Sequence, residues 1–256
     1  MADPYHDRPE WSYSSMKKIL DSGIDYAVGA RMGMTPKPDS AAIDLGQLVH
    51  QTILGGGDQF VIMKYPDLRS RDAQQWVKDQ KAEGKIVISL ETYDEAQKII
   101  KNIKDHPHSQ TYLFGKGIKH EQEMFGETEE GVKLRGKADA IKLVQDEALI
   151  ICDIKTTAFF DKFASQAYWQ HYDLQAANYT LIGAHTMNVE PELINYYFCV
   201  AETVAPYRVQ YFHASIEFVE SGERKLWQCV QTIKAFGDNQ PNFLMPEIKE
   251  LGDWSQ

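Results

Sequence analysis

Apolar and polar residues alternate with a period of two across residues 134–157, and this pattern predicts two neighbouring β-strands. A polar turn, Gln145-Asp146-Glu147, separates them. The second strand begins as a nearly continuous apolar run at residues 148–152, which is typical of a fully buried strand. It ends in Asp153-Ile154-Lys155, where two charged side chains are costly to bury unless each finds a partner.

The charged end of this strand pair is a candidate site. Asp153 and Lys155 are two residues apart, so on a strand they point to the same face. If the strands are antiparallel neighbours, Asp139 on the first strand approaches Asp153 across the ladder. Two acids and a lysine on one face can hold a hard cation beside a group that activates water. The alternative is a hairpin with a weak surface ion pair, and only the rest of the chain separates the two interpretations.

Further elements follow from apolar spacing and from turn residues. Helices are predicted at residues 12–20, 41–54, 92–105, 172–184 and 216–236, and strands at residues 61–63, 86–88, 118–125, 193–200 and 207–212. The second helix carries Gly46 and His50 four residues apart, and the fourth carries Gln175 and Tyr179 at the same spacing, so each pair shares a helix face. The third helix is expected to open with a capping box at Thr92. Loops are predicted at residues 29–39 and in the aromatic stretch after Lys155.

This order of elements indicates a mixed α/β (α+β) fold with a central mixed sheet flanked by helices, and it excludes a doubly wound parallel sheet. Neither glycine-rich nucleotide-binding fingerprint occurs in the chain. We expect a flexible arm at residues 1–11, a single domain at residues 12–237 and a C-terminal tail at residues 238–256, to which no secondary structure is assigned.

Composition narrows the class of protein. The chain of 256 residues is 43% hydrophobic, enough for a sizeable core. It has no apolar run of membrane-spanning length, its first ten residues are polar rather than signal-like, and its three cysteines form no C-x-x-C pair. These features predict a reduced, cytoplasmic protein without a cysteine-based metal site. The net charge of −10 argues against a general nucleic-acid coat but is compatible with an enzyme that places acids in its site.

Basic residues are dense between residues 64 and 85, where acids interleave with them. The pattern fits a solvated helix with ion pairs, or else a flap that contacts phosphates. On the second interpretation Arg69 and Arg71, together with Arg31, are candidates for binding DNA and its terminal phosphate.

Six short motifs follow one another along residues 12–200. They are Ser12-x-Ser14-x-Met16-Lys17, Leu45-Gly46-Gln47-Leu48-Val49-His50, Glu121-x-Glu123-x-Phe125, Gly136-Lys137-Ala138-Asp139, Asp153-Ile154-Lys155-Thr156-Thr157 and Gln175-Ala176-Ala177-x-Tyr179. Each motif alone is weak, but the six in this order resemble the PD-(D/E)xK nuclease superfamily. The resemblance is closer to its exodeoxyribonuclease VIII (RecE-like) type, the recombination exonucleases of phages and prophages. It implies a restriction-endonuclease-like core.

The resemblance also implies a ligand set for metal ions. Asp139 and Asp153 would be the metal-holding acids, with the backbone carbonyl of Ile154 as a further ligand. His50 would bind or border a second ion. Glu121 would complete the acidic set, although Glu123 competes for this role because both are expected to face the same way on their strand. One or two Mg²⁺ ions per site are implied, and the histidine ligand suggests that Mn²⁺ substitutes.

The remaining motif residues would serve the reaction itself. Lys155 would orient or deprotonate the attacking water and stabilise charge at the phosphorus, and nearby metal ions are expected to lower its pKa. Gln175 and Tyr179 would support this lysine and the scissile strand.

By resemblance, the expected activity is metal-dependent digestion of one strand of linear double-stranded DNA, 5′ to 3′. The product would be a 3′ overhang for a single-strand annealing protein in the cytoplasm of a bacterial host cell. A ring-shaped homo-oligomer, a tetramer or a trimer, is implied as well. Two alternatives stay open: a structure- or site-specific endonuclease on the same fold, and a catalytically inactive module that binds DNA or protein.

Overall fold

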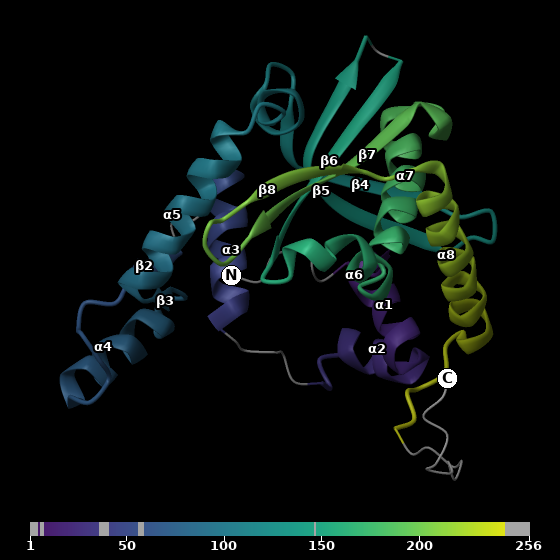
Figure 1. Ribbon diagram of the computed structural model, residues 1–256. Coiled ribbons are helices and arrows are strands. Elements are labelled where there is room, and N and C mark those ends of the chain that lie inside the picture. The colour runs from purple at the N-terminus through teal and green to yellow at the C-terminus, as the bar shows by residue number, and fades with distance from the viewer. Residues whose placement is uncertain (1–4, 6–7, 36–40, 56–58, 146, 244–256) are drawn as a thin grey trace, which may run out of the picture.

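A mixed β-sheet runs through the middle of the fold (Figure 1). The computed structural model describes residues 5, 8–35, 41–55, 59–145 and 147–243. The sheet is made of β1 (Trp11–Ser12), β4 (Lys119–Glu127), β5 (Lys133–Val144), β6 (Ala148–Thr157), β7 (Ile194–Glu202) and β8 (Val209–His213). Its order is β1-β5-β6-β7-β8, with β4 on the other edge of β5. β6 and β7 pair in parallel, as do β1 and β5, whereas β4 with β5, β5 with β6 and β7 with β8 are antiparallel.

The sheet forks between β5 and β6. The antiparallel ladder starts next to the turn and ends at the pair Ala140 and Cys152. At the end of β5 away from this turn, β1 pairs with the same edge of β5 at Leu134 and Arg135. Among the described strands, none pairs with this edge of β5 at residues 136–139, so Asp139 lies where the two strands separate.

Helices cover both faces of the sheet (Figure 1). On one face, α3 (Ala41–Ile53) and α5 (Leu90–Asp105) form a core with the sheet. On the other, α1 (Tyr13–Ser22), α7 (Tyr172–Met187) and α8 (Ile216–Phe236) form a second core. The central strands serve both cores, because Ile151 belongs to the second core and its neighbour Cys152 to the first.

The remaining elements lie around these layers. They are α2 (Ile24–Arg31), β2 (Phe60–Ile62), α4 (Arg71–Ala82), β3 (Ile86–Ile88), the π-helical turn η1 (Gln110–Phe114), the 3₁₀ turns η2 (Phe160–Lys162) and η3 (Pro191–Leu193), and α6 (Phe163–Trp169). β2 and β3 pair in parallel as a separate two-stranded sheet. Figure 1 shows α4 with these two strands beside α5, at the outer edge of the fold. Within the described residues, no helix combines the length and the apolarity needed to cross a bilayer.

The mixed α/β class with a central sheet flanked by helices is confirmed, and most elements agree with the prediction to within a few residues. Three local predictions were wrong. The expected loop at 29–39 begins with the last turn of α2, while residues 36–39 lie outside the described part. The helix at 92–105 begins at Leu90, because the hydroxyl of Ser89 rather than Thr92 caps it. The aromatic loop after Lys155 contains η2 and α6.

The predicted flexible arm is ordered where the structure describes it. Trp11 pairs with β5, and Tyr5 is buried. The guanidinium of Arg8 lies 4.2 Å from the ring centre of Phe125. Of the predicted tail, residues 238–243 are described, and the backbone N–H of Asn242 donates to Asp25 on α2. The rest of both segments, residues 1–4, 6–7 and 244–256, lies outside the described residues, as does Asp146 of the central turn.

The close packing of α8 on α7 depends on Gly222. A Cβ atom at this position would lie 1.9 Å from the carbonyl oxygen of Asp173, which is backbone and cannot turn away. Helix propensity alone favours alanine by about 1 kcal/mol, but overpacking costs roughly 1–3 kcal/mol or more. We therefore expect Gly222→Ala to lower the free energy of unfolding by about 2 kcal/mol in urea denaturation. Gly183→Ala is the control, since its Cβ would meet only side-chain tips at 3.2 and 3.3 Å. Equal effects of the two substitutions would contradict this account.

Candidate active site

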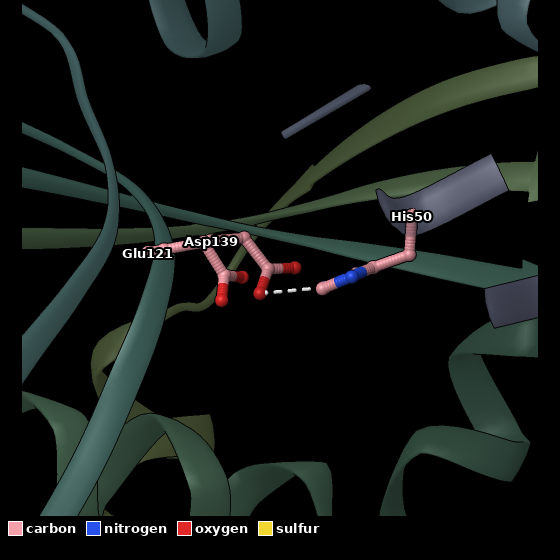
Figure 2. A group of neighbouring side chains, drawn as sticks. All are labelled: His50, Glu121 and Asp139. Atoms are coloured by element: carbon pink, nitrogen blue, oxygen red, sulfur yellow. Dashed lines mark ion pairs between the residues drawn. The ribbon is translucent and has the colours of Figure 1, made fainter. Parts of the chain in front are cut away.

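Three side chains from separate elements converge at the fork in the sheet (Figure 2). His50 reaches in from the last turn of α3, Glu121 from β4 and Asp139 from β5. Their ligand atoms all lie within 4.8 Å of one another, and His50 Nε2 is 2.8 Å from Asp139 Oδ1. Two carboxylates and an imidazole form a donor set that suits a divalent cation such as Mg²⁺ or Mn²⁺.

Asp139 is fixed by both of its carboxylate oxygens. Oδ2 accepts a hydrogen bond of 2.7 Å from the backbone N–H of Ile154 on β6, and Oδ1 faces His50. The side chain therefore bridges the two strands at the position where their ladder ends. This bond satisfies a backbone donor that would otherwise be buried and unpaired, so Asp139 holds the fork together as well as facing the cluster.

Glu121 lies on β4 between His120 and Gln122, which pair with the residues on either side of Asp139 on β5. Its φ of +52° places it in the left-handed region, which costs a non-glycine residue of the order of 1–3 kcal/mol. Such strain is concentrated at functional sites, where the surrounding structure imposes it. Glu123, two residues on, is exposed and is not part of the cluster, so the structure brings only Glu121 to Asp139. Glu121 also forms an ion pair with Lys137 on β5.

Asp153 lies beside the cluster but turns toward other partners. Its Oδ1 accepts a hydrogen bond of 2.6 Å from Gln175 Nε2, and its Oδ2 is 2.5 Å from Lys155 Nζ. The Lys155 ammonium also lies 4.7 Å from the ring centre of Tyr172 on α7. The first turns of α7 therefore hold the Asp153–Lys155 pair from the face of the sheet opposite α3.

Tyr179 has a different partner from the one expected. Its hydroxyl donates to the carbonyl of Lys137 at 3.1 Å and accepts from the N–H of the same residue at 3.3 Å. These bonds satisfy the edge of β5 that lacks a strand partner. Tyr179 thus supports β5 at the fork rather than contacting Lys155.

Burial and neighbouring charges set the protonation of the site. Burial lowers the pKa of His50, but the hydrogen bond to Asp139 and the surrounding carboxylates raise it, and the net direction is upward. Burial raises the pKa of Asp153, against the attraction of Lys155 and together with the repulsion from Asp139. For Lys155, burial lowers the pKa and Asp153 raises it, so that the net shift is upward. This direction belongs to the protein without a metal ion, and the lowering expected from metal charge stays a prediction.

Two cavities adjoin His50. The larger, about 500 Å³, is bounded by Glu121 and Asp139, by the first residues of α1 and by the basic residues of β5. The smaller, about 330 Å³, is lined by Gly46, Ile154, Lys155 and Tyr172. The cluster therefore borders open space on two sides, and His50 lies between the two cavities.

Four residues near the site were given no functional role from the sequence. Arg135 and Lys137 line the larger cavity, and they precede Asp139 by four and two positions on β5, a spacing that could have revealed them. Tyr172 lies one helical turn before Gln175 on α7, so the two share a helix face, and this spacing could also have revealed it. Tyr5 belongs to the segment predicted as an arm, and no local pattern marks it.

The three arginines proposed to contact DNA do not line either cavity. Arg31 donates to the backbone carbonyls of Glu10 and Pro9 and lies over the ring of Trp11, so it holds the N-terminal segment against α2. Arg69 is exposed and pairs with Asp67, and Arg71 begins α4.

Close contact between α3 and β6 positions His50. A Cβ atom at Gly46 would lie 2.9 Å from the Oγ1 atom of Thr156, so Gly46→Ala should push the helix outward. We expect Mn²⁺ to bind about tenfold more weakly, by analogy with the loss of outer-shell support at metal sites, with little change in the melting temperature. Isothermal titration calorimetry measures this. Adding Thr156→Ala should restore affinity, and failure of this second substitution to do so would refute the steric explanation.

The pKa of His50 is raised above its ordinary value near 6.5, so its imidazole keeps a proton to higher pH than usual. A metal ion at this cluster must displace that proton. Affinity for Mn²⁺ should therefore rise with pH, by up to about tenfold per unit, until the pH passes the raised pKa, and then level off. His50→Gln should bind Mn²⁺ more weakly and lose this step. The same pH dependence in His50→Gln would show that another group is responsible.

Comparisons with known proteins agree with this architecture. The family described as PDDEXK-like domain of unknown function (DUF3799) matches residues 12–242. No curated protein matches the chain significantly. The crystal structure of a candidate exonuclease from Eubacterium rectale aligns with a TM-score of 0.60 and 16% identity, over 95% of this chain and 91% of that one. The structure of SSO0001 aligns over 77% of this chain and 88% of its own at 14% identity, with a TM-score of 0.30, too low to indicate a shared fold. The family match spans most of the chain, which therefore belongs to the PDDEXK-like family and has the PD-(D/E)xK nuclease fold.

Proposed function

We propose that this chain is a divalent-metal-dependent nuclease that hydrolyses phosphodiester bonds of DNA. One observation carries the proposal: His50, Glu121 and Asp139 converge at the fork in the sheet, beside the buried Asp153–Lys155 pair. Asp139 and Asp153 are both almost fully buried, and buried carboxylates are tolerated mainly when they are paired or serve a site. The family match and the fold support the same class of activity.

The residues fit a divalent ion, which His50, Glu121 and Asp139 would hold, with Asp153 and the carbonyl of Ile154 nearby. When bound, the ion supplies positive charge to the phosphate and a more acidic water molecule. Lys155 Nζ lies 2.5 Å from Asp153 Oδ2. From this position it would orient or deprotonate the attacking water and stabilise charge at the phosphorus. Gln175 keeps Asp153 facing Lys155 through the bond to Oδ1.

The substrate strand is placed by positive charge in the larger cavity. Arg135 and Lys137 line it together with the metal-ligand candidates, so phosphates next to the scissile bond can pair with them. They replace Arg31, Arg69 and Arg71 as our candidates for contacts close to the reacting bond. Any contact of these three arginines with DNA would lie further from the site.

We infer further that the enzyme is an exonuclease acting on linear duplex DNA, 5′ to 3′, leaving 3′ overhangs for an annealing protein in a phage or prophage recombination pathway. The motif order and the fold shared with a candidate exonuclease support the exonuclease assignment. A ring of three or four subunits is part of the same proposal. It is supported by large apolar side chains exposed on α6 and α8, among them Trp169, Ile216 and Trp227.

The proposal is tested by a time course on linear duplex DNA labelled at the 5′ or the 3′ end, with Mg²⁺ or Mn²⁺ and with closed circles as a second substrate. Early release of the 5′ label, with circles untouched, is the expected result. Lys155→Ala and Asp153→Ala should lower the rate by at least about a hundredfold while remaining folded, whereas Lys142→Ala on β5 should not. Cut circles would favour an endonuclease. No metal-dependent cleavage of any substrate would leave a binding module and refute the proposed function.

A further inference from the structure

The ammonium of Lys155 has the face of an aromatic ring as its second contact. Its side chain is only 17% exposed, and Asp153 Oδ2 lies against one side of the ammonium. The ring centre of Tyr172 is 4.7 Å from Lys155 Nζ, within the range of about 6 Å for cation–π contacts. A largely desolvated cation gains more from such a ring than an exposed one does. The ring therefore contributes to the position of the ammonium.

Aromatic neighbours fix the ring of Tyr172. Its centre lies 5.9 Å from the ring centre of Phe163 on α6 and 5.7 Å from that of Phe198 on β7. Both phenylalanines are buried in the core that α7 shares with the sheet. A tyrosine side chain has only two main torsion angles, so this packing leaves the ring little freedom. The ring is thus a rigid surface for the ammonium.

The same helix also holds the other charge of the ion pair. Gln175, one turn after Tyr172 on α7, donates a hydrogen bond of 2.6 Å to Asp153 Oδ1. α7 therefore contacts the carboxylate with an amide and the ammonium with a ring. One helix sets the positions of both charges relative to the sheet.

These contacts leave one side of the ammonium open toward the smaller cavity. Lys155 and Tyr172 both line this cavity together with His50, whereas neither of them lines the larger one. An ammonium has three N–H donors, and the carboxylate oxygen and the ring face occupy the directions of two. The remaining donor can face the smaller cavity, on the side where His50 also lies.

We propose that Tyr172 is a positioning residue for the cleavage reaction. Its ring holds the Lys155 ammonium against Asp153 and directs it into the smaller cavity, toward the attacking water and the reacting phosphate. This inference rests on the proposed function and goes beyond it, because it gives a role to a residue outside the six sequence motifs. The role belongs to the face of the ring and does not need the hydroxyl group.

The test weakens the negative charge on the ring face while changing the size of the side chain little. Tyr172→Phe keeps the ring and is the reference, and mono-, di- and trifluorinated phenylalanine at position 172 withdraw electrons from the face step by step. The single-turnover rate on linear duplex DNA in Mg²⁺ should fall with each fluorine, by about tenfold in total. DNA affinity, measured by anisotropy in EDTA, should not change, since the ring acts on the reacting group only.

The matched control is Phe160, whose ring also lies beneath a cation. The guanidinium carbon of Arg208 is 4.5 Å from its ring centre, and neither residue lines the two cavities beside His50. The same fluorinated series at Phe160 should leave the cleavage rate constant.

A second measurement does not depend on cleavage. Fluorination at position 172 should raise the unfolding equilibrium constant in urea by about fivefold when Lys155 is present, and should have no effect in Lys155→Met, where no charge faces the ring. A cleavage rate that stays constant along the series, or a loss of DNA affinity without a loss of rate, would overturn the positioning role. If the coupling in stability is found but no protein of the series, wild type included, cleaves any DNA, the proposed function fails and the role in catalysis fails with it.

Discussion

The hydrogen bond between the Asp139 carboxylate and the backbone N–H of Ile154 is the interaction on which the arrangement of the site depends. A regular ladder at this position would pair β5 with β6 and leave no opening. The carboxylate replaces the ladder with one side-chain bond and keeps an oxygen directed at His50. Replacing Asp139 by an apolar residue would leave the Ile154 donor buried and unsatisfied, so a metal-ligand candidate and a structural bond are the same group.

The two helical layers act on this fork from opposite faces. α3 carries His50 to Asp139 because Gly46 lets the helix approach Thr156, and α7 carries Gln175 to Asp153. α7 is in turn packed on α8 at Gly222. A buried ion pair such as Asp153–Lys155 is weak evidence of stability, since desolvation offsets most of the attraction. Burying this pair costs stability, which the packing of the two helical layers offsets, and it fixes the position of the Lys155 ammonium.

Patterns that are local in sequence were sufficient to predict the central strands, the helix with His50 and the mixed α/β class, because the strands and this helix have apolar patterns of their own. The helix with Gln175 was predicted as well, although it is buried on nearly every side and has no apolar face of its own. The position of Glu121 was assigned from a motif, while its left-handed backbone depends on the register with β5 and is not visible in the sequence. The pairing of Trp11 with Leu134 joins residues far apart in the chain, and so does the contact of Tyr5 with Arg135. Long-range contacts of this kind leave no periodic signal, which is why residues 1–11 were predicted as an arm although Tyr5 and Trp11 contact the sheet.

The charges of the site explain how a chain with a net charge of −10 can be suited to a polyanion. Three carboxylates, Glu121, Asp139 and Asp153, are balanced by three cations, Arg135, Lys137 and Lys155, so the site itself is close to neutral. A divalent ion held by the carboxylates, as proposed, would make the site positive where a phosphate approaches, and it would compete with Lys137 for Glu121. Lys137 would then be available to the DNA strand. Binding of the ion and binding of the strand should reinforce each other by an equal factor in both directions, because the coupling between two equilibria is reciprocal.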